Sequence, residues 1–108
     1  MSKAERISQR IERLEAEYRI QLIAALSECA GGRWGLFGQN EHLGNWWHTE
    51  KLDELRNLAD SINVLRDRLG ESPYQLHEEF EAARGMDDSN QVGEPKLAQE
   101  WLSMLEAY

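Results

Sequence analysis

Apolar residues recur at helical spacing through most of the chain, beginning with residues 2–29. They stand three or four positions apart, at Ile7, Ile11, Leu14, Tyr18, Leu22, Ala25 and Cys29. The pattern repeats after eleven residues, a period of about 3.67 residues per turn that keeps one apolar stripe on one side of a nearly straight helix. Ile20, Ile23 and Leu26 widen the stripe in the second half, where we expect a broad face against a core. Ser2, followed by Glu5 three positions later, is a capping pair that can begin this helix.

A second amphipathic helix is predicted over residues 49–69. Its apolar face is rich in leucine, and it consists of Leu52, Leu55, Leu58, Ala59, Ile62, Leu65 and Leu69. Thr49, or Asn45 if the helix starts early, can cap its beginning, and Gly70 can close it. We expect the two helices to form a long antiparallel hairpin.

Two shorter helices are predicted in the last third, over residues 73–84 and 95–107. Ser72 followed by Pro73 is a helix start signal, and Gly85 is expected to stop the first of the two. Pro95 can open the last helix, whose expected buried side consists of Leu97, Trp101, Met104 and Leu105. The 108 residues therefore predict one all-α domain of four helices.

Residues 31–48 interrupt the helical pattern with a run of glycine and aromatic residues. We expect Gly31 and Gly32 to close the first helix in the left-handed conformation. Arginine and aromatic residues dominate protein interfaces, and this segment concentrates them at Arg33, Trp34, Phe37, Trp46 and Trp47. Two interpretations stay open: the rings fold back as a cap over the end of the hairpin, or they form a surface for a partner.

The net charge of −8 is carried almost entirely by the last third of the chain. Residues 71–108 contain nine carboxylates against Arg84 and Lys96. A phosphate-binding surface needs clustered Lys and Arg, so direct binding of nucleic acid is not expected. The acidic third is typical of a solvated surface, and it also suits contact with a basic protein or mimicry of nucleic acid.

Cysteine usage and the start of the chain bear on the compartment. Cys29 is the only cysteine, which excludes an internal disulfide and fits a reducing environment. The first residues are charged throughout, without the apolar core of a signal peptide, and no apolar run reaches the ~20 residues of a membrane span. We therefore expect a cytoplasmic protein with no membrane contact.

No motif for catalysis, a metal ion or a cofactor is found in the sequence. Cys29, His42, His48 and His77 are metal-ligating residue types, but they lack the paired spacing of a zinc site. Cys29 falls at a predicted helix C-terminus, where the helix dipole disfavours a thiolate nucleophile. Glu78, Glu79 and Glu81 could offer paired carboxylates, but such acids on a short helix are typical of a solvated face. We predict no catalytic residue, no metal and no cofactor.

The leading hypothesis is a non-enzymatic interaction protein, a small regulator or adaptor that binds through residues 31–48 and the acidic last third. One alternative is a small-ligand or metal-dependent enzyme with Cys29, His42 and His48 around a pocket. The first predicted helix is longer than the second, so part of its apolar stripe is expected to be uncovered. A homodimer is therefore predicted through Ile7, Ile11, Leu14 and Tyr18.

Overall fold

The computed structural model describes residues 2–31, 46–86 and 94–106, and within these ranges it contains helices and no strand. The helices are α1 (Lys3–Ala30), α2 (Trp46–Arg68), α3 (Gln75–Met86) and α4 (Glu94–Glu106). The predicted all-α fold, with a long helical pair followed by two shorter helices, is confirmed.

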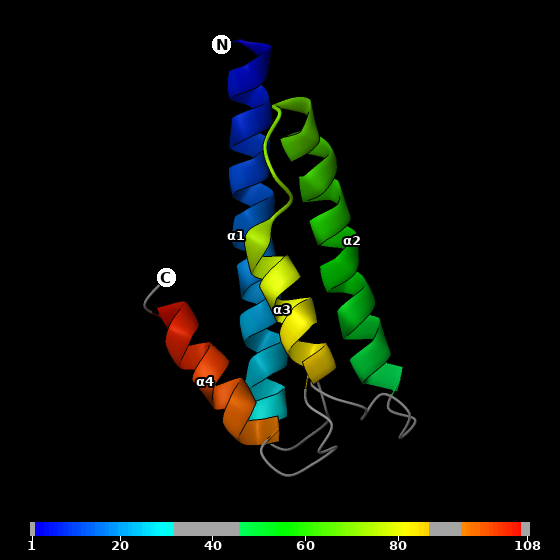
Figure 1. Ribbon diagram of the computed structural model, residues 1–108, viewed down its shortest axis with the longest axis vertical. Helices are drawn as coiled ribbons and strands as arrows, with labels where there is room; N and C mark the ends of the chain where they lie inside the picture. The colour runs from blue at the N-terminus through cyan, green and yellow to red at the C-terminus, as the bar shows by residue number, and fades with distance from the viewer. Residues whose placement is uncertain (1, 32–45, 87–93, 107–108) are drawn as a thin grey trace.

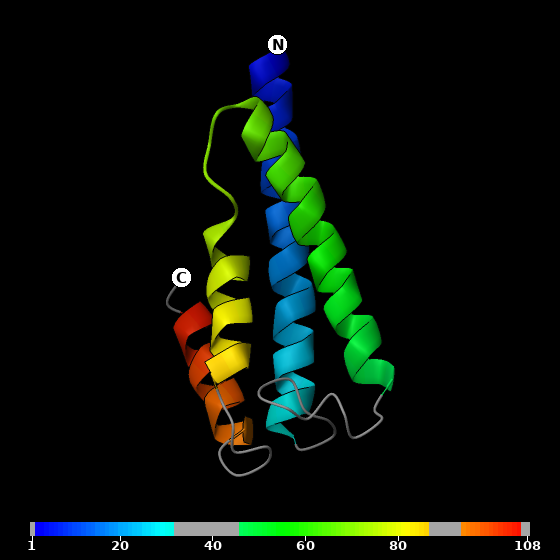
Figure 2. The ribbon, with the colours of Figure 1, turned by 45° about the vertical axis from the view of Figure 1, so that its right-hand side comes forward.

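Helix α1 is the element against which the other helices pack (Figure 1). It contacts both α2 and α4. Helices α1 and α2 run antiparallel along the long axis of the molecule, as predicted, and α3 and α4 lie beside the C-terminal half of α1 (Figures 1 and 2). The two short helices therefore extend the hairpin into a four-helix arrangement on one side of α1.

Two of the predicted caps on the long helices, Ser2 and Gly70, are confirmed, whereas Thr49 lies inside α2 and Gly31 is not left-handed. The Glu5 backbone N–H donates to Ser2 Oγ at 3.1 Å, as expected for a cap. After α2, Gly70 adopts φ 73°, and the Glu71 N–H donates to the Arg66 carbonyl at 2.9 Å, which is the Schellman closure. Gly31 instead has φ −81° and donates to the Ser27 carbonyl at 3.1 Å, so the predicted left-handed closure at this position is wrong.

The predicted limits of α3 are wrong at both ends. Ser72 and Pro73 precede the helix, which begins at Gln75. Here the Tyr74 N–H donates to the Asn63 Oδ1 atom of α2 at 2.8 Å. This partner comes from another helix, so the local start signal does not predict the contact. At the other end the helix continues through Gly85 to Met86. Glycine weakens a helix without preventing it, so it does not by itself mark an end.

The core draws residues from all four helices and from the connection before α3. Its fully buried members include Tyr18, Leu22, Leu26, Cys29, Leu52, Leu55, Ile62, Leu76 and Phe80. The eleven-residue stripe of α1 faces this core, as predicted, with Ile7 and Leu14 half-buried at its edge. On α4, Ala98 is completely buried and Met104 is 38% exposed, which corrects the predicted buried side of that helix.

The uncovered stretch expected at the start of α1 is smaller than predicted. The C-terminal end of α2 reaches the first turns of α1, where Lys3, Ala4, Ile7, Arg68 and Leu69 line an open hollow of about 440 Å³. Arg66 Nη1 also lies 3.1 Å from Glu15 Oε2. Ile11, which was expected to lie in the uncovered stretch, is buried.

A search of the described helices for a stretch able to cross a membrane found none that is both long and apolar enough.

Candidate functional site

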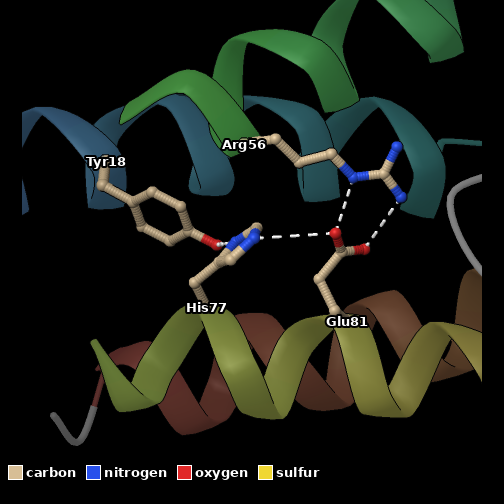
Figure 3. Close-up of polar contacts among 4 residues, drawn as sticks. All are labelled: Tyr18, Arg56, His77 and Glu81. Atoms are coloured by element: carbon tan, nitrogen blue, oxygen red, sulfur yellow. Dashed lines mark hydrogen bonds and ion pairs between the residues drawn. The ribbon is translucent and has the colours of Figure 1, made fainter. Parts of the chain in front are cut away.

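Four polar side chains from three helices meet beside the core and form the polar cluster, which consists of Tyr18, Arg56, His77 and Glu81 (Figure 3). Tyr18 Oη lies 2.6 Å from His77 Nδ1, and His77 Nε2 lies 3.6 Å from Glu81 Oε2. Glu81 also accepts two hydrogen bonds from Arg56, at 2.6 Å from Nε and 3.2 Å from Nη2. The cluster thus links α1 to α3 and α3 to α2.

Helical spacing explains how α3 supplies the centre of this cluster. His77 and Glu81 are four residues apart, so they project from the same side of the helix. Leu76 and Phe80, the residues just before them, are buried in the core, which places His77 and Glu81 at its boundary. Aromatic rings border the site. The Tyr18 ring makes T-shaped contacts with the rings of Tyr74 and His77, with 5.1 and 5.4 Å between the ring centroids.

The electrostatics of the cluster favour neutral Tyr18 and neutral His77. Burial raises the pKa of the Tyr18 hydroxyl far above its ordinary value, with smaller contributions from Tyr74 and the Glu81 carboxylate. Burial also lowers the pKa of the His77 imidazole, and this effect outweighs the opposing influence of Glu81. In the tautomer that carries the imidazole proton on Nε2, facing the Glu81 carboxylate, the Tyr18 O–H donates to His77 Nδ1.

The Arg56 guanidinium contributes a fixed positive charge at the end of this chain of contacts. It acts with burial to lower the pKa of His77, while Asp60 and Glu78 act with Glu81 to raise it. Tyr18 is completely buried, so a substrate cannot reach its hydroxyl in this arrangement. The cluster therefore joins α1, α2 and α3 at a defined register.

A second feature lies on the side of α1 away from the core. We define the outer face of α1 as Ala16, Ile20, Ile23, Ala24 and Ser27, all of which are exposed. Ile20 is 62% exposed and Ile23 is 41% exposed. Both were predicted to widen the buried stripe, and this prediction is wrong because α2 and α4 pack around the opposite side of α1. Of the three widening residues, Leu26 alone is buried.

The aromatic residues predicted to bind a partner are at the edge of the described structure. Arg33, Trp34 and Phe37 lie outside the described residues. Trp46 and Trp47 form the start of α2, earlier than a start at Thr49 and in agreement with the alternative early start after Asn45. Their side chains are also outside the description. The interpretation of residues 31–48 as a cap or a partner surface therefore stays a prediction.

The four residues predicted to form a dimer contact differ in how deeply the fold buries them. Ile11 and Tyr18 belong to the core of the single chain, and Ile7 and Leu14 pack at its edge. A second copy could reach only the exposed parts of Ile7 and Leu14 without opening the chain. The homodimer itself stays a prediction.

The residues weighed for metal or thiol chemistry are not brought together in the described part of the chain. Cys29 is buried in the core, His77 belongs to the polar cluster, and His42 and the side chain of His48 lie outside the description. No group of three or more His, Cys, Asp or Glu side chains is arranged around a common point among residues 2–31, 46–86 and 94–106.

Compared with protein-family models, with curated proteins and with solved structures, the chain shows no significant match to any of them.

Sequence reasoning missed both features. The sequence pattern places Tyr18 in an apolar stripe and predicts one solvated face for the acids of α3, whereas Glu81 is half-buried against Arg56. A signal was present, because His77 and Glu81 sit four apart beside the buried positions of α3. The partners Tyr18 and Arg56 carry no such signal, since their approach depends on how three helices pack.

Proposed function

We propose that this chain is a non-enzymatic helical interaction module that binds a protein through the outer face of α1. The observation that carries the proposal is the exposure of Ile20 and Ile23 on an otherwise polar helix surface. Burial of apolar side chains is the main favourable term in most protein association, so an uncovered pair of isoleucines supplies a driving force.

The composition around the two isoleucines supports this assignment. Residues 20–27 contain no charged side chain, although 30% of the whole chain is charged. Charged residues are depleted at the centres of protein interfaces, and the small residues Ala24 and Ser27 allow another backbone to approach closely. The charged positions at the border of this stretch include Glu17 and Arg19, both exposed, which resembles the polar rim of an interface.

The closed polar cluster also favours a binding role over an enzymatic one. Its hydroxyl and imidazole are engaged with each other at 2.6 Å, and its carboxylate is engaged with Arg56. A general acid or base must reach the substrate directly or through one water, and the Tyr18 hydroxyl is completely buried.

We also propose that segment 31–48 and the acidic last third of this chain contact the partner, and that the protein is cytoplasmic. Trp34→Ala and Trp47→Ala distinguish the two interpretations of the segment. A partner surface should lose binding and keep its stability, whereas a cap should lose about 3–5 kcal/mol of unfolding free energy.

The outer face can be tested with a photo-crosslinking amino acid, p-benzoylphenylalanine, introduced at Ile23 in the full chain and irradiated in cells. We expect a discrete adduct between proteins. The matched control is the same substitution at Val64, an apolar residue of α2 that is 55% exposed, which should give little adduct.

Two outcomes would contradict the proposal. One is no adduct at either position while circular dichroism shows an intact fold. The other is a crosslink from position 23 to residues of the same chain, which would mean that the chain covers its own outer face.

A further inference from the structure

We infer that the partner of the outer face is a second copy of this chain, with the two α1 helices packed antiparallel. This inference rests on the proposed function, because it names the occupant of the same face.

The spacing of the outer positions is that of a two-helix contact. Starting from Arg13, the outward positions alternate in steps of three and four, at Arg13, Ala16, Ile20, Ile23 and Ser27, all of them exposed. Alternating steps of three and four give a period of about 3.5 residues, which keeps a stripe facing one partner helix along a left-handed crossing. The core stripe of the same helix follows the eleven-residue period instead, so α1 carries two stripes on opposite sides with different partners.

The order of side-chain sizes along this outer stripe is the same in both directions. It runs from small Ala16 through large Ile20 and Ile23 to small Ser27. When two copies are placed antiparallel about the point between positions 21 and 22, Ile20 of each copy faces Ile23 of the other. Ala16 then faces Ser27, so large residues fill the centre and small residues let the backbones approach at both ends. In a parallel pair in register, side chains of equal size would also face each other. Side-chain size therefore does not distinguish the parallel from the antiparallel arrangement, and the charges do.

Arg13 favours the antiparallel arrangement. In a parallel pair the two Arg13 side chains would face each other. In the antiparallel pair each Arg13 lies level with the last turn of α1 of the other copy. That turn contains no basic residue, and the C-terminal end of a helix carries a partial negative charge that a cation stabilises. The contact thus pairs opposite charges at both ends.

The oligomeric state provides the first test. Light scattering coupled to size exclusion should give twice the 12.5 kDa chain mass for the wild type. Ile20→Glu should give a single chain, because it places two carboxylates at the centre of the contact. Val64→Glu is the matched control and should leave the mass unchanged. Circular dichroism on all three proteins shows whether each keeps its helices.

Cysteine crosslinking provides a second test, of orientation, in a Cys29→Ser background. The double variant Ala16→Cys/Ser27→Cys should form a disulfide-linked dimer under mild oxidation. Ala16→Cys alone should not, because two copies of position 16 would lie about 16 Å apart along the antiparallel helices, beyond the roughly 7 Å that a disulfide spans between Cα atoms.

The outcomes separate this inference from the proposed function. A single-chain mass at every concentration, or an unchanged mass for Ile20→Glu, would overturn the second copy as partner. Ready crosslinking of Ala16→Cys alone would overturn the antiparallel arrangement. If the photo-crosslink from position 23 joins a different protein, the proposed function stands and this inference fails.

Discussion

At the scale of single residues, the most constrained positions are polar ones at the boundary of the core. The Tyr18 hydroxyl is completely buried, and a buried hydroxyl without a hydrogen-bond partner costs free energy. His77 Nδ1 supplies the partner at 2.6 Å, and it can accept only while the imidazole is neutral. Protonation of His77 would reverse this hydrogen bond and place a positive charge in a buried contact, so the packing of α3 on α1 is coupled to the protonation of one histidine.

We expect stability to fall in mild acid because of His77. Its pKa is lowered in the folded chain from the ordinary 6.5 by burial. Below pH 6.5 the unfolded chain therefore binds more protons than the folded chain, so the unfolding free energy decreases as pH falls from the ordinary pKa toward the folded one. Above that range this contribution is fully present. Urea unfolding at about pH 7.5 and about pH 5 measures the change.

His77→Gln is the comparison that isolates this effect. The variant keeps a polar side chain without a group that titrates in this range, so the stability difference between wild type and variant should narrow in acid. Tyr18→Phe keeps the buried imidazole and should retain the pH dependence. An equal pH dependence in wild type and His77→Gln would contradict the assignment to His77.

At the scale of elements, the helix ends show which capping signals in the sequence are sufficient to predict where a helix begins or ends. Ser2 and Gly70 cap as predicted, because each cap closes on backbone groups a few residues away. Ser72 does not cap α3, because the adjacent Tyr74 N–H is held by Asn63 from another helix. Local signals therefore predict an end where the capping partner is local, and they fail where the partner comes from a distant part of the chain.

The two glycines that end the long helices should respond differently to alanine. Gly70→Ala should lower the unfolding free energy by about 1–2 kcal/mol, since a side chain at φ 73° is strained. Gly31→Ala is the control and should be close to neutral. Its φ of −81° suits alanine, and an added Cβ would lie 3.5 Å from the Ser27 carbonyl oxygen, an ordinary contact. Equal losses in urea unfolding would argue against the left-handed turn at Gly70.

At the scale of the whole molecule, the four helices share one core, so none is expected to be stable alone. Helix α4 joins this core through Ala98, Trp101 and Leu105. The Trp101 ring meets the Phe80 ring of α3 edge to face, with 5.7 Å between centroids. A small domain with a shared core unfolds in one cooperative transition.

Trp101→Ala should therefore destabilise the entire molecule rather than release α4 alone. We expect a loss of about 3–5 kcal/mol, the range for an emptied aromatic site, with the complete helical signal in far-UV circular dichroism melting at a lower temperature. Met104→Ala, on the exposed side of the same helix, should change stability by about 0.5 kcal/mol or less. Two separate transitions in the Trp101 variant would show that α4 docks independently.

The sequence alone determined the elements of this protein. Apolar spacing predicted four helices, the antiparallel pair and most of the core, because a helix that buries one face has apolar residues at helical spacing along that face. Tertiary structure decided whether a residue at the edge of a predicted apolar face is buried or exposed. Ile20 and Ile23 point outward while Ala98 points inward, because their burial depends on where α2, α3 and α4 approach. It also decided that Tyr18 and Arg56, 38 positions apart along the chain, contact two neighbouring side chains of α3, His77 and Glu81 respectively. Such contacts arise from packing between helices, and no spacing within one helix encodes them.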